Sequence, residues 1–243
     1  MKSLMQQMKF LFSISLAIFL STNLWAQKPK VENLQKFDAK TTHFGFSLGI
    51  NTASFALHRN AFNTPFDTLA SIDVVNQSGF NLGIVSELHL HKYVGVRFIP
   101  TLVFAQRNLN YQFIRSDGDV ETVERMIEST YLDFPLLLKY RSARLNNFAA
   151  YLIAGAKYSI DLASNEDVRN EDIPESIVKL KRSTTSAEVG VGTDFFLPYF
   201  KFAIELKMSY GLQDVLIKDD TELSNPIEKI VPKMFFITFL FEG

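Results

Sequence analysis

Large apolar residues recur at every second position in eight segments of the chain, and this pattern constrains the fold more than any other feature. In the first segment, HFGFSLGIN at residues 43–51, Phe44, Phe46, Leu48 and Ile50 alternate with small or polar residues. Successive side chains of a β-strand point to opposite faces of the sheet, so this segment is predicted to be a strand with one apolar face. The same alternation occurs at residues 78–91, 93–106, 129–141, 147–162, 185–196, 200–211 and 232–243. The chain is therefore predicted to be all-β.

The polar faces of these strands carry charged residues in mid-strand. These residues are Glu87, Arg97, Asp133, Lys139, Lys157, Glu188, Asp194, Glu205 and Lys207. Charged groups cannot all face a dry core without partners, and the apolar faces are too large to be left in water. Two arrangements remain: a two-sheet sandwich with the apolar faces inside, or a membrane barrel with the apolar faces toward lipid.

The lengths of the connections favour the membrane barrel. Short links at 91–92, 142–146 and 197–199 alternate with long links at 52–77, 107–129, 163–182 and 212–231. Short periplasmic turns and long outer loops are typical of outer-membrane barrels, whereas a sandwich gives no reason for this alternation. The bilayer also requires every backbone polar group to be paired, so the sheet must close. We predict an eight-stranded antiparallel transmembrane β-barrel of up-and-down topology over residues 43–243.

Two prolines interrupt the strand pattern. Pro100 and Pro135 lie in mid-strand, where proline cannot donate a hydrogen bond to the neighbouring strand. Both are predicted to mark a bulge or a bend.

The N-terminal residues have the features of a secretory signal peptide. Lys2 and Lys9 precede a short apolar run at residues 10–20, and small residues lead to Ala26 before a polar stretch. The predicted signal peptide is residues 1–26, with cleavage after Ala26. A transmembrane anchor is the alternative, but the run is shorter than the roughly 20 residues that a membrane-spanning helix needs. Residues 27–42 are predicted to be a polar periplasmic lead-in, and the cell outer membrane is the predicted location.

Composition excludes several classes of protein. The chain has no cysteine, so it carries no lipid-anchored cysteine and no disulfide, and its net charge of −1 gives no basic field for nucleic acid. An eight-stranded barrel is only wide enough inside for side chains, so the inward charges are predicted to neutralise one another and to leave no pore. Glycines on the inward face are predicted to leave space for long side chains; they are Gly45, Gly49, Gly79, Gly83, Gly95, Gly155, Gly190 and Gly192.

One small group of residues resembles a metal site. His89 and His91 lie two apart on one strand, with Glu87 two residues further back, and two histidines with a carboxylate can bind a transition metal. The same pattern also fits a polar rim at a periplasmic turn, which we favour. No serine lies in a nucleophile elbow, and no glycine-rich loop leads into a helix. We predict no catalytic, cofactor-binding or metal-binding residues, no cofactor and no small-molecule substrate.

Three stretches resemble one family of membrane barrels. They are residues 32–51 with ENL, KFD and HFGF, residues 130–164 with YLDFPLLLKY, and residues 188–214 with YFKFAIELK. The YLDFPLLLKY motif fits eight-stranded barrels in general, whereas the first and third stretches resemble the PorT family of the type IX secretion system of Bacteroidetes. The resemblance implies a non-enzymatic outer-membrane component of protein secretion, also needed for adhesin delivery in gliding species. It implies other secretion-system proteins as partners and supplies no catalytic residues.

Two other functions remain open. A generic small barrel could act as a surface adhesin or defence protein through its outer loops, of which 52–77 and 163–182 match no family pattern. A lipid-modifying barrel enzyme would depend on Glu87 and His89. For the function that the family resemblance implies, the expected partners are other secretion-system proteins and outer-membrane lipid.

Overall fold

The computed structural model of the chain describes residues 32–59, 69–114, 118–166, 177–218 and 224–243. The chain divides into two units, and the second, Asn33–Gly243, contains every strand named below. The predicted signal peptide at residues 1–26 lies outside the described residues, as does the start of the predicted lead-in. No helix among the described residues is long and apolar enough to span a membrane.

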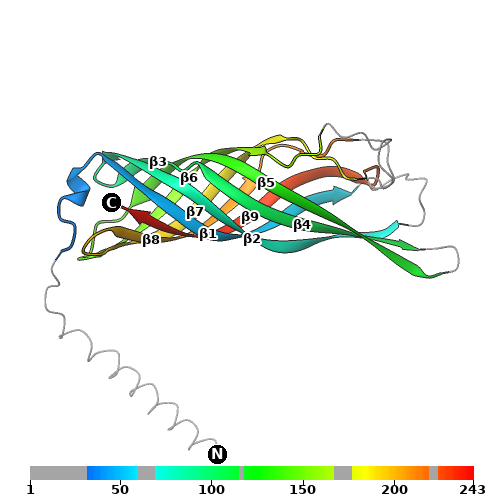
Figure 1. Cartoon of the computed structure of the whole chain (residues 1–243), viewed down its shortest axis with the longest axis horizontal. Coiled ribbons are helices and arrows are strands. Elements are labelled where there is room, and N and C mark those ends of the chain that lie inside the picture. The colour runs from blue at the N-terminus through cyan, green and yellow to red at the C-terminus, as the bar shows by residue number, and fades with distance from the viewer. Residues whose placement is uncertain (1–31, 60–68, 115–117, 167–176, 219–223) are drawn as a thin grey trace, which may run out of the picture. The chain divides into compact units, whose positions relative to one another are not determined.

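Nine strands form one closed antiparallel sheet (Figure 1). Strands that follow one another in the chain pair, except the third and fourth, and the first strand pairs with both the second and the ninth, which closes the ring. The strands are β1 (Thr42–Arg59), β2 (Leu69–His91), β3 (Val94–Phe98), β4 (Thr101–Ile114), β5 (Val120–Arg141), β6 (Phe148–Asp161), β7 (Ser183–Phe196), β8 (Lys201–Gly211) and β9 (Ile227–Glu242). Because β3 and β4 both lie between β2 and β5, they are two parts of one strand. The ring thus has the predicted eight-strand, up-and-down architecture.

Both prolines lie at the level where β3 ends and β4 begins. Pro100 lies in the gap between these strands, as predicted for a bend, although its carbonyl still accepts a hydrogen bond from the Ile84 amide at 3.0 Å. Pro135 stays within β5, and its register with β6 continues without a shift, so the predicted bulge does not form on that side. On its other side, Asp133 pairs with Thr101 and Leu136 pairs with Phe98. Pro135 therefore lies opposite the interruption, and both irregularities of the ladder fall at one level.

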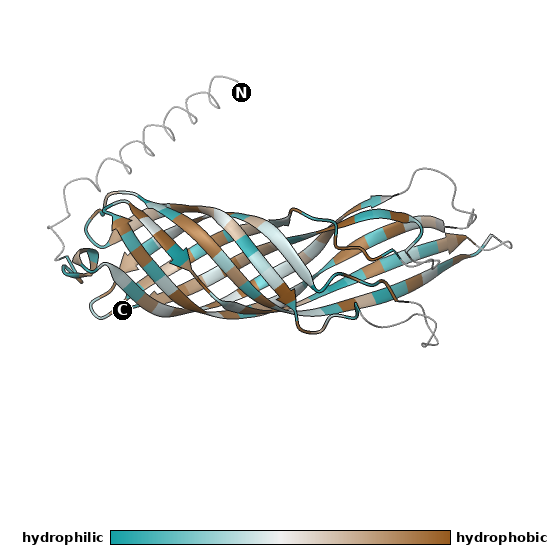
Figure 2. Ribbon diagram, turned by 90° about the horizontal axis from the view of Figure 1, so that it is seen from above, coloured by the Kyte–Doolittle hydropathy of each residue, from teal (hydrophilic) through white to brown (hydrophobic). Residues whose placement is uncertain are grey.

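The apolar faces lie on the outside of the barrel, as predicted. Phe44, Phe46, Leu48 and Ile50 are each at least half exposed, whereas Ser47 between them is 1% exposed. Apolar and polar residues alternate along the strands in the hydropathy colouring (Figure 2). An outward apolar band around a closed sheet is the surface that a β-barrel presents to the hydrocarbon of a membrane.

Several strands continue far beyond the segments predicted from the sequence. β2 has 23 residues and β5 has 22, about twice the 9–11 residues that cross a bilayer. The predicted long loops at 52–77 and 107–129 are wrong in large part, because β1 ends at Arg59, β2 begins at Leu69, and β4 pairs with β5 as far as Ile114 and Val120. The segment at 212–231 is also shorter than predicted, since β9 begins at Ile227. The described residues of 163–182 form no strand, only an isolated bridge between Leu180 and Leu216.

We call the part of the barrel beyond the apolar band the outer extension. It comprises residues 54–59, 69–77, 107–114, 120–128 and 227–233, with 177–181 and 214–217 beside them. β1 and β2 pair only as far as Ala53 and Gln77, and β5 and β6 only as far as Tyr131 and Asp161, so the strands divide into two groups there (Figure 1). The two groups pack their inner faces together around a core of Phe55, Ile72, Leu109, Tyr111, Val178, Val215, Leu216, Ile227 and Ile230.

Candidate functional site: the filled lumen and its periplasmic cap

The charged residues predicted on the polar faces all point into the lumen. Glu87, Arg97, Asp133, Lys139, Lys157, Glu188, Asp194 and Glu205 are each at most 3% exposed. They occupy every second position of their strands, so the period of a β-strand places them on the inner face. The ammonium group of Lys207 is also inside, within 3.0 Å of the Glu188 carboxylate.

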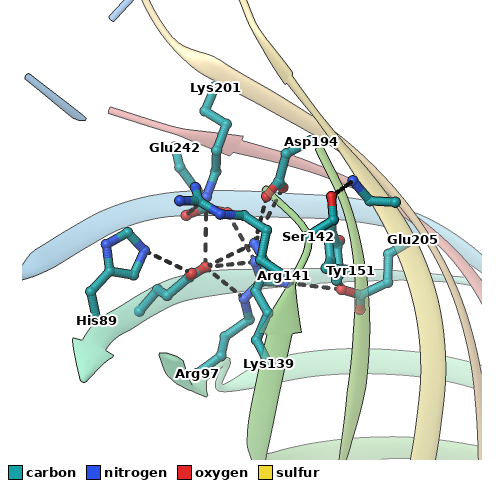
Figure 3. A network of polar contacts seen from close by, with 12 residues as sticks. His89, Arg97, Lys139, Arg141, Ser142, Tyr151, Asp194, Lys201, Glu205 and Glu242 are labelled. Carbon is teal, nitrogen blue, oxygen red and sulfur yellow. Dashed lines mark hydrogen bonds and ion pairs between the residues drawn. The ribbon is translucent and has the colours of Figure 1, made fainter. Parts of the chain in front are cut away.

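Arg97 is the centre of one group of salt bridges near the periplasmic end (Figure 3). Its guanidinium donates to Glu87 at 2.6 Å, to Glu205 at 2.8 Å and to Glu242 at 3.3 Å. These carboxylates come from β2, β8 and β9, so one side chain connects strands on opposite sides of the barrel. The planar guanidinium suits this role because its five donors point in fixed directions.

Two lysines complete this group, which we call the Arg97 network. Lys139 lies 2.9 Å from Asp194 and 3.4 Å from Glu87, and Lys201 lies 2.7 Å from Glu242. The Tyr151 hydroxyl donates to Glu205 at 2.9 Å. Three strong cations thus face four carboxylates, and the side chains fill the cross-section of the barrel at this level.

A second group, the Lys157 network, lies further toward the outer end. Lys157 is 2.8 Å from Asp133 and 3.5 Å from Glu188, and Lys207 is 3.0 Å from Glu188. Two cations balance two carboxylates here. Buried charges are costly unless they are paired, so both networks explain how the lumen holds so many ionised groups.

The predicted role of the inward glycines holds for some of them only. A Cβ at Gly192 would collide with the Tyr151 ring, and one at Gly83 would lie 2.6 Å from the Thr101 hydroxyl. A Cβ at Gly45, Gly79 or Gly155 would instead collide with a carbonyl oxygen of the neighbouring strand. The first pair makes room for lumen side chains, whereas the other three allow two strands to approach closely.

Part of the predicted lead-in closes the periplasmic mouth. Phe37, in a short 3-10 helix η1 (Phe37–Ala39), is 4% exposed, and its ring stacks on His43 with 3.7 Å between centroids. Its ring also meets Phe196 edge-on at 5.9 Å, and the Lys201 ammonium lies 4.9 Å from its centroid. We call residues 33–41 the periplasmic cap, after the side of the membrane that the sequence predicts for this end of the barrel.

Polar contacts fix the cap to the rim. Asp38 forms a salt bridge of 2.8 Å with Arg141, and Asn33 donates to the Phe196 carbonyl at 2.9 Å. Arg144 donates to the Asn33 carbonyl and covers the ring of Phe196. This end of the lead-in is therefore packed against the barrel.

The histidine pair is not brought together. His89 lies 3.1 Å from the Glu87 carboxylate and 4.6 Å from the His43 ring, inside the mouth. His91 is exposed and close to Tyr93, because the pairing of β2 with β3 shifts register between His89 and His91. The described residues contain no group of three histidine or acidic side chains arranged to hold a metal ion.

Sequence reasoning missed several residues of this site. Glu242 belongs to the last alternating segment, but its position beside the C-terminus gave no sign of a partner. Arg107 falls at the start of the predicted loop 107–129, yet it is fully buried at the outer end of the lumen. Phe37 is one of a few scattered apolar residues in a polar stretch, with Val31 and Leu34, so no periodic pattern marks it.

The described lumen has little free space. Two small cavities of about 10 Å³ each lie in the lumen, one between the two networks and one between the Lys157 network and the outer core, and each has about the space that one water molecule needs. The two salt-bridge networks, the outer core and the cap fill the rest of the inner cross-section together with two small apolar clusters, which include Ile99 and Leu137 in one and Val103 and Phe236 in the other.

Several solved structures are similar to the chain. No curated protein shows significant similarity to the chain. Among solved structures, the outer membrane protein OprG from Pseudomonas aeruginosa is 16% identical, with a TM-score of 0.44 over 89% of this chain and 99% of that one. Neisserial surface protein A is 9% identical, with a TM-score of 0.41 over 83% of this chain and 98% of that one. AlkL, solved in lipid bilayers, is 13% identical, with a TM-score of 0.43 over 91% of this chain and 95% of that one.

The family assignment comes from the sequence match. Residues 25–216 match the family described as outer membrane protein beta-barrel domain, which is most of the chain. This match, with the closed antiparallel ring and its outward apolar band, places the protein in the outer membrane. The chain belongs to the outer membrane protein beta-barrel domain family.

Proposed function

We propose that the protein is a non-conducting, non-enzymatic barrel that supports protein export by a type IX secretion system through contacts with other secretion proteins. The filled lumen is the observation that supports this proposal most. Arg97 and Lys139, both at most 1% exposed, connect carboxylates across the barrel, so a solute would have to break several buried salt bridges to pass. The resemblance of residues 32–51 and 188–214 to the PorT family supplies the type of system.

The periplasmic cap is the proposed contact surface. Its apolar residue Phe37 is used inside the barrel, whereas Lys36 and Lys40 beside it are exposed. A surface fixed to the rim presents these charges in a defined position, which favours recognition by an acidic surface of a periplasmic partner. The barrel would then act as a membrane anchor for that contact.

Gene deletion tests the general proposal. Loss of the protein should abolish release of secreted cargo into the medium, and expression of the wild-type chain should restore it. Normal secretion in the deletion strain would contradict the proposal.

A charge reversal tests the proposed surface. The double variant Lys36→Glu/Lys40→Glu should assemble like the wild type, since both side chains point to solvent, but should secrete less cargo. Lys218→Glu, an exposed lysine at the outer end, is the matched control and should secrete normally. Equal secretion by both variants would move the partner contact away from the cap.

A second function, as a surface adhesin or defence protein, is supported by the outer extension. A cleft of about 370 Å³ lies there, lined in part by Met126, Ile127, Ala163 and Val178. Replacing the whole connection 163–182 with a short turn should then abolish attachment to host or surface ligands while secretion continues. The same replacement should have no effect on attachment if the protein serves secretion alone.

A further inference from the structure

One buried cation of the lumen has no acidic partner among the residues that the structure describes. Arg107 on β4 is 0% exposed, and among the described residues no carboxylate lies within salt-bridge distance of its guanidinium. Its Nη1 donates to the Tyr131 hydroxyl at 3.1 Å and to the Ser129 hydroxyl at 3.4 Å, and its Nε and Nη2 have no hydrogen-bond partner in the described part of the chain. The other buried cations described above each have at least one carboxylate within 3.0 Å.

An arginine cannot escape this situation by losing its proton. The rings of Phe55 and Tyr131 lie 4.6 and 5.3 Å from its Cζ, and such contacts offset part of the cost of burial. They leave two donors unused, however, and an uncompensated charge in a buried site is strongly unfavourable. The structure therefore requires a further acceptor beside Arg107.

The cavity next to Arg107 has the chemistry of an anion site. It has a volume of about 10 Å³ and is lined by Arg107, Lys157 and a set of hydroxyl groups from Tyr131, Ser159, Thr184, Ser186 and Ser209. The serines and Thr184 are all at most 7% exposed, and the Thr184 hydroxyl has no partner. The lining of this cavity contains no acidic side chain. The two carboxylates that pair with Lys157, those of Asp133 and Glu188, belong to the Lys157 network and not to this lining.

We propose that this cavity binds one small anion of the chloride class, held by Nε and Nη2 of Arg107 and by the surrounding hydroxyl groups. The anion would neutralise Arg107 at the junction between the charged lumen and the apolar outer core. The small cavity excludes larger anions such as inorganic phosphate. Water alone would satisfy the hydrogen bonds of Arg107 but would leave its charge uncompensated.

The site lies inside the lumen between the Lys157 network and the apolar outer core, so the anion is best supplied while the protein folds. The full chain should be refolded in detergent in sodium bromide and crystallised from the same salt. An anomalous bromide peak within hydrogen-bond distance of Arg107 is the expected result. Density for water alone, without an anomalous peak, would overturn the proposal.

Thermal unfolding gives an independent measurement. The wild-type protein, refolded in equal concentrations of sodium chloride, bromide or gluconate, should unfold roughly 2–4 °C higher in the halides if the anion is present at a few times its Kd. Equal unfolding temperatures in all three salts would contradict the proposal.

Three variants separate this site from general salt effects. Arg107→Met should lose the halide dependence, and Thr184→Val should need a several-fold higher halide concentration for the same shift. Arg144→Met, which removes an arginine that also lies over a phenylalanine ring, is the matched control and should keep the full shift. A halide shift that persists unchanged in Thr184→Val and Arg107→Met would show that the anion acts elsewhere and would overturn the proposal. If Arg107→Met does not fold, the halide dependence of Thr184→Val and the bromide crystals test the proposal instead.

Discussion

The membrane-embedded lumen and the outer extension are filled differently within the same strands: the lumen combines charged networks with small apolar clusters, whereas the outer extension has an apolar core. In β4, the inward residue Thr101 near the middle of the barrel is polar, whereas the inward residues Leu109 and Tyr111 are apolar. The outward residues change in the other direction, from Leu102 and Phe104 to polar residues such as Gln112. The solvent outside explains this change: lipid demands an apolar outer face, whereas water demands a polar one.

The comparison shows why the two regions differ in how they resist change. The outer core resembles that of a soluble protein, where burial of apolar area provides most of the stability. In the lumen, the outer face already meets lipid, and the inner face is stabilised by the pairing of charges that were costly to bury. Removal of one partner should therefore be more damaging in the lumen than in the outer core.

The largest effect is expected for Arg97→Met. This change leaves Glu87, Glu205 and Glu242 without their shared cation, and the loss of one partner of a buried ion pair costs about 3–5 kcal/mol of unfolding free energy. Urea unfolding of the refolded barrel measures the loss. Arg97→Lys keeps the charge but not the fork of donors, so it should lose less; a fully stable Arg97→Met would show that the network is not needed for folding.

Leu109→Ala should destabilise the outer extension by about 2–5 kcal/mol, because it opens a cavity in a core where Leu109 is 0% exposed. The damage should stay local, since the strands separate into two groups above the membrane band. Hydrogen exchange should therefore rise at residues 54–59 and 107–114 and change little in β6 to β8. Ile114→Ala, on the same strand but 44% exposed, is the control and should have little effect. Faster exchange throughout the barrel would show that the two regions unfold together.

Much of this fold could be predicted from the sequence, and the part that could not has a physical cause. The segments within the membrane were found because their alternation keeps one phase, large apolar residues outward and charges inward. Residues 107–114 also alternate, with Leu109, Tyr111 and Phe113 apolar, but the phase of hydropathy is inverted there. This inverted stretch was therefore interpreted as a loop, although its backbone continues β4 without a break.

The candidate site was predictable as a charged lumen and not as specific pairs. The inward positions of Glu87, Arg97 and Lys139 follow from their place in the alternation. The individual salt bridges depend on how strands that are far apart in the sequence are shifted along one another. Arg97 and Glu242 are one such pair. The cap is held in the mouth of the barrel mainly by the buried ring of Phe37. Whether this ring fits depends on the width of the mouth, which the sequence does not give.

Gly192→Ala tests how tightly the lumen is filled. The added Cβ would collide with the Tyr151 ring, and overpacking of this kind costs about 1–3 kcal/mol. The midpoint of urea unfolding should fall accordingly. Gly95→Ala is the matched control, because the nearest atom to its Cβ would be the Leu88 carbonyl oxygen at 3.3 Å. Equal stability of the two variants would mean that Tyr151 can move, and that the lumen has more freedom than the Arg97 network implies.

The smallest effect is expected for Asp38→Ala. This change removes an arginine–carboxylate pair from the rim of the barrel, whereas the pairs of the Arg97 network lie inside the lumen. Asp38 lies 2.8 Å from Arg141, but its side chain is 34% exposed, so water and salt screen the pair and its contribution is about 0.2–1 kcal/mol. A double-mutant cycle with Arg141→Met measures the coupling, which should fall further at high salt. The Arg97–Glu205 pair, measured in the same way, should be several-fold stronger and insensitive to salt. Equal coupling in the two pairs would mean that solvent reaches the Arg97 network, and that burial is not what separates the lumen from the rim.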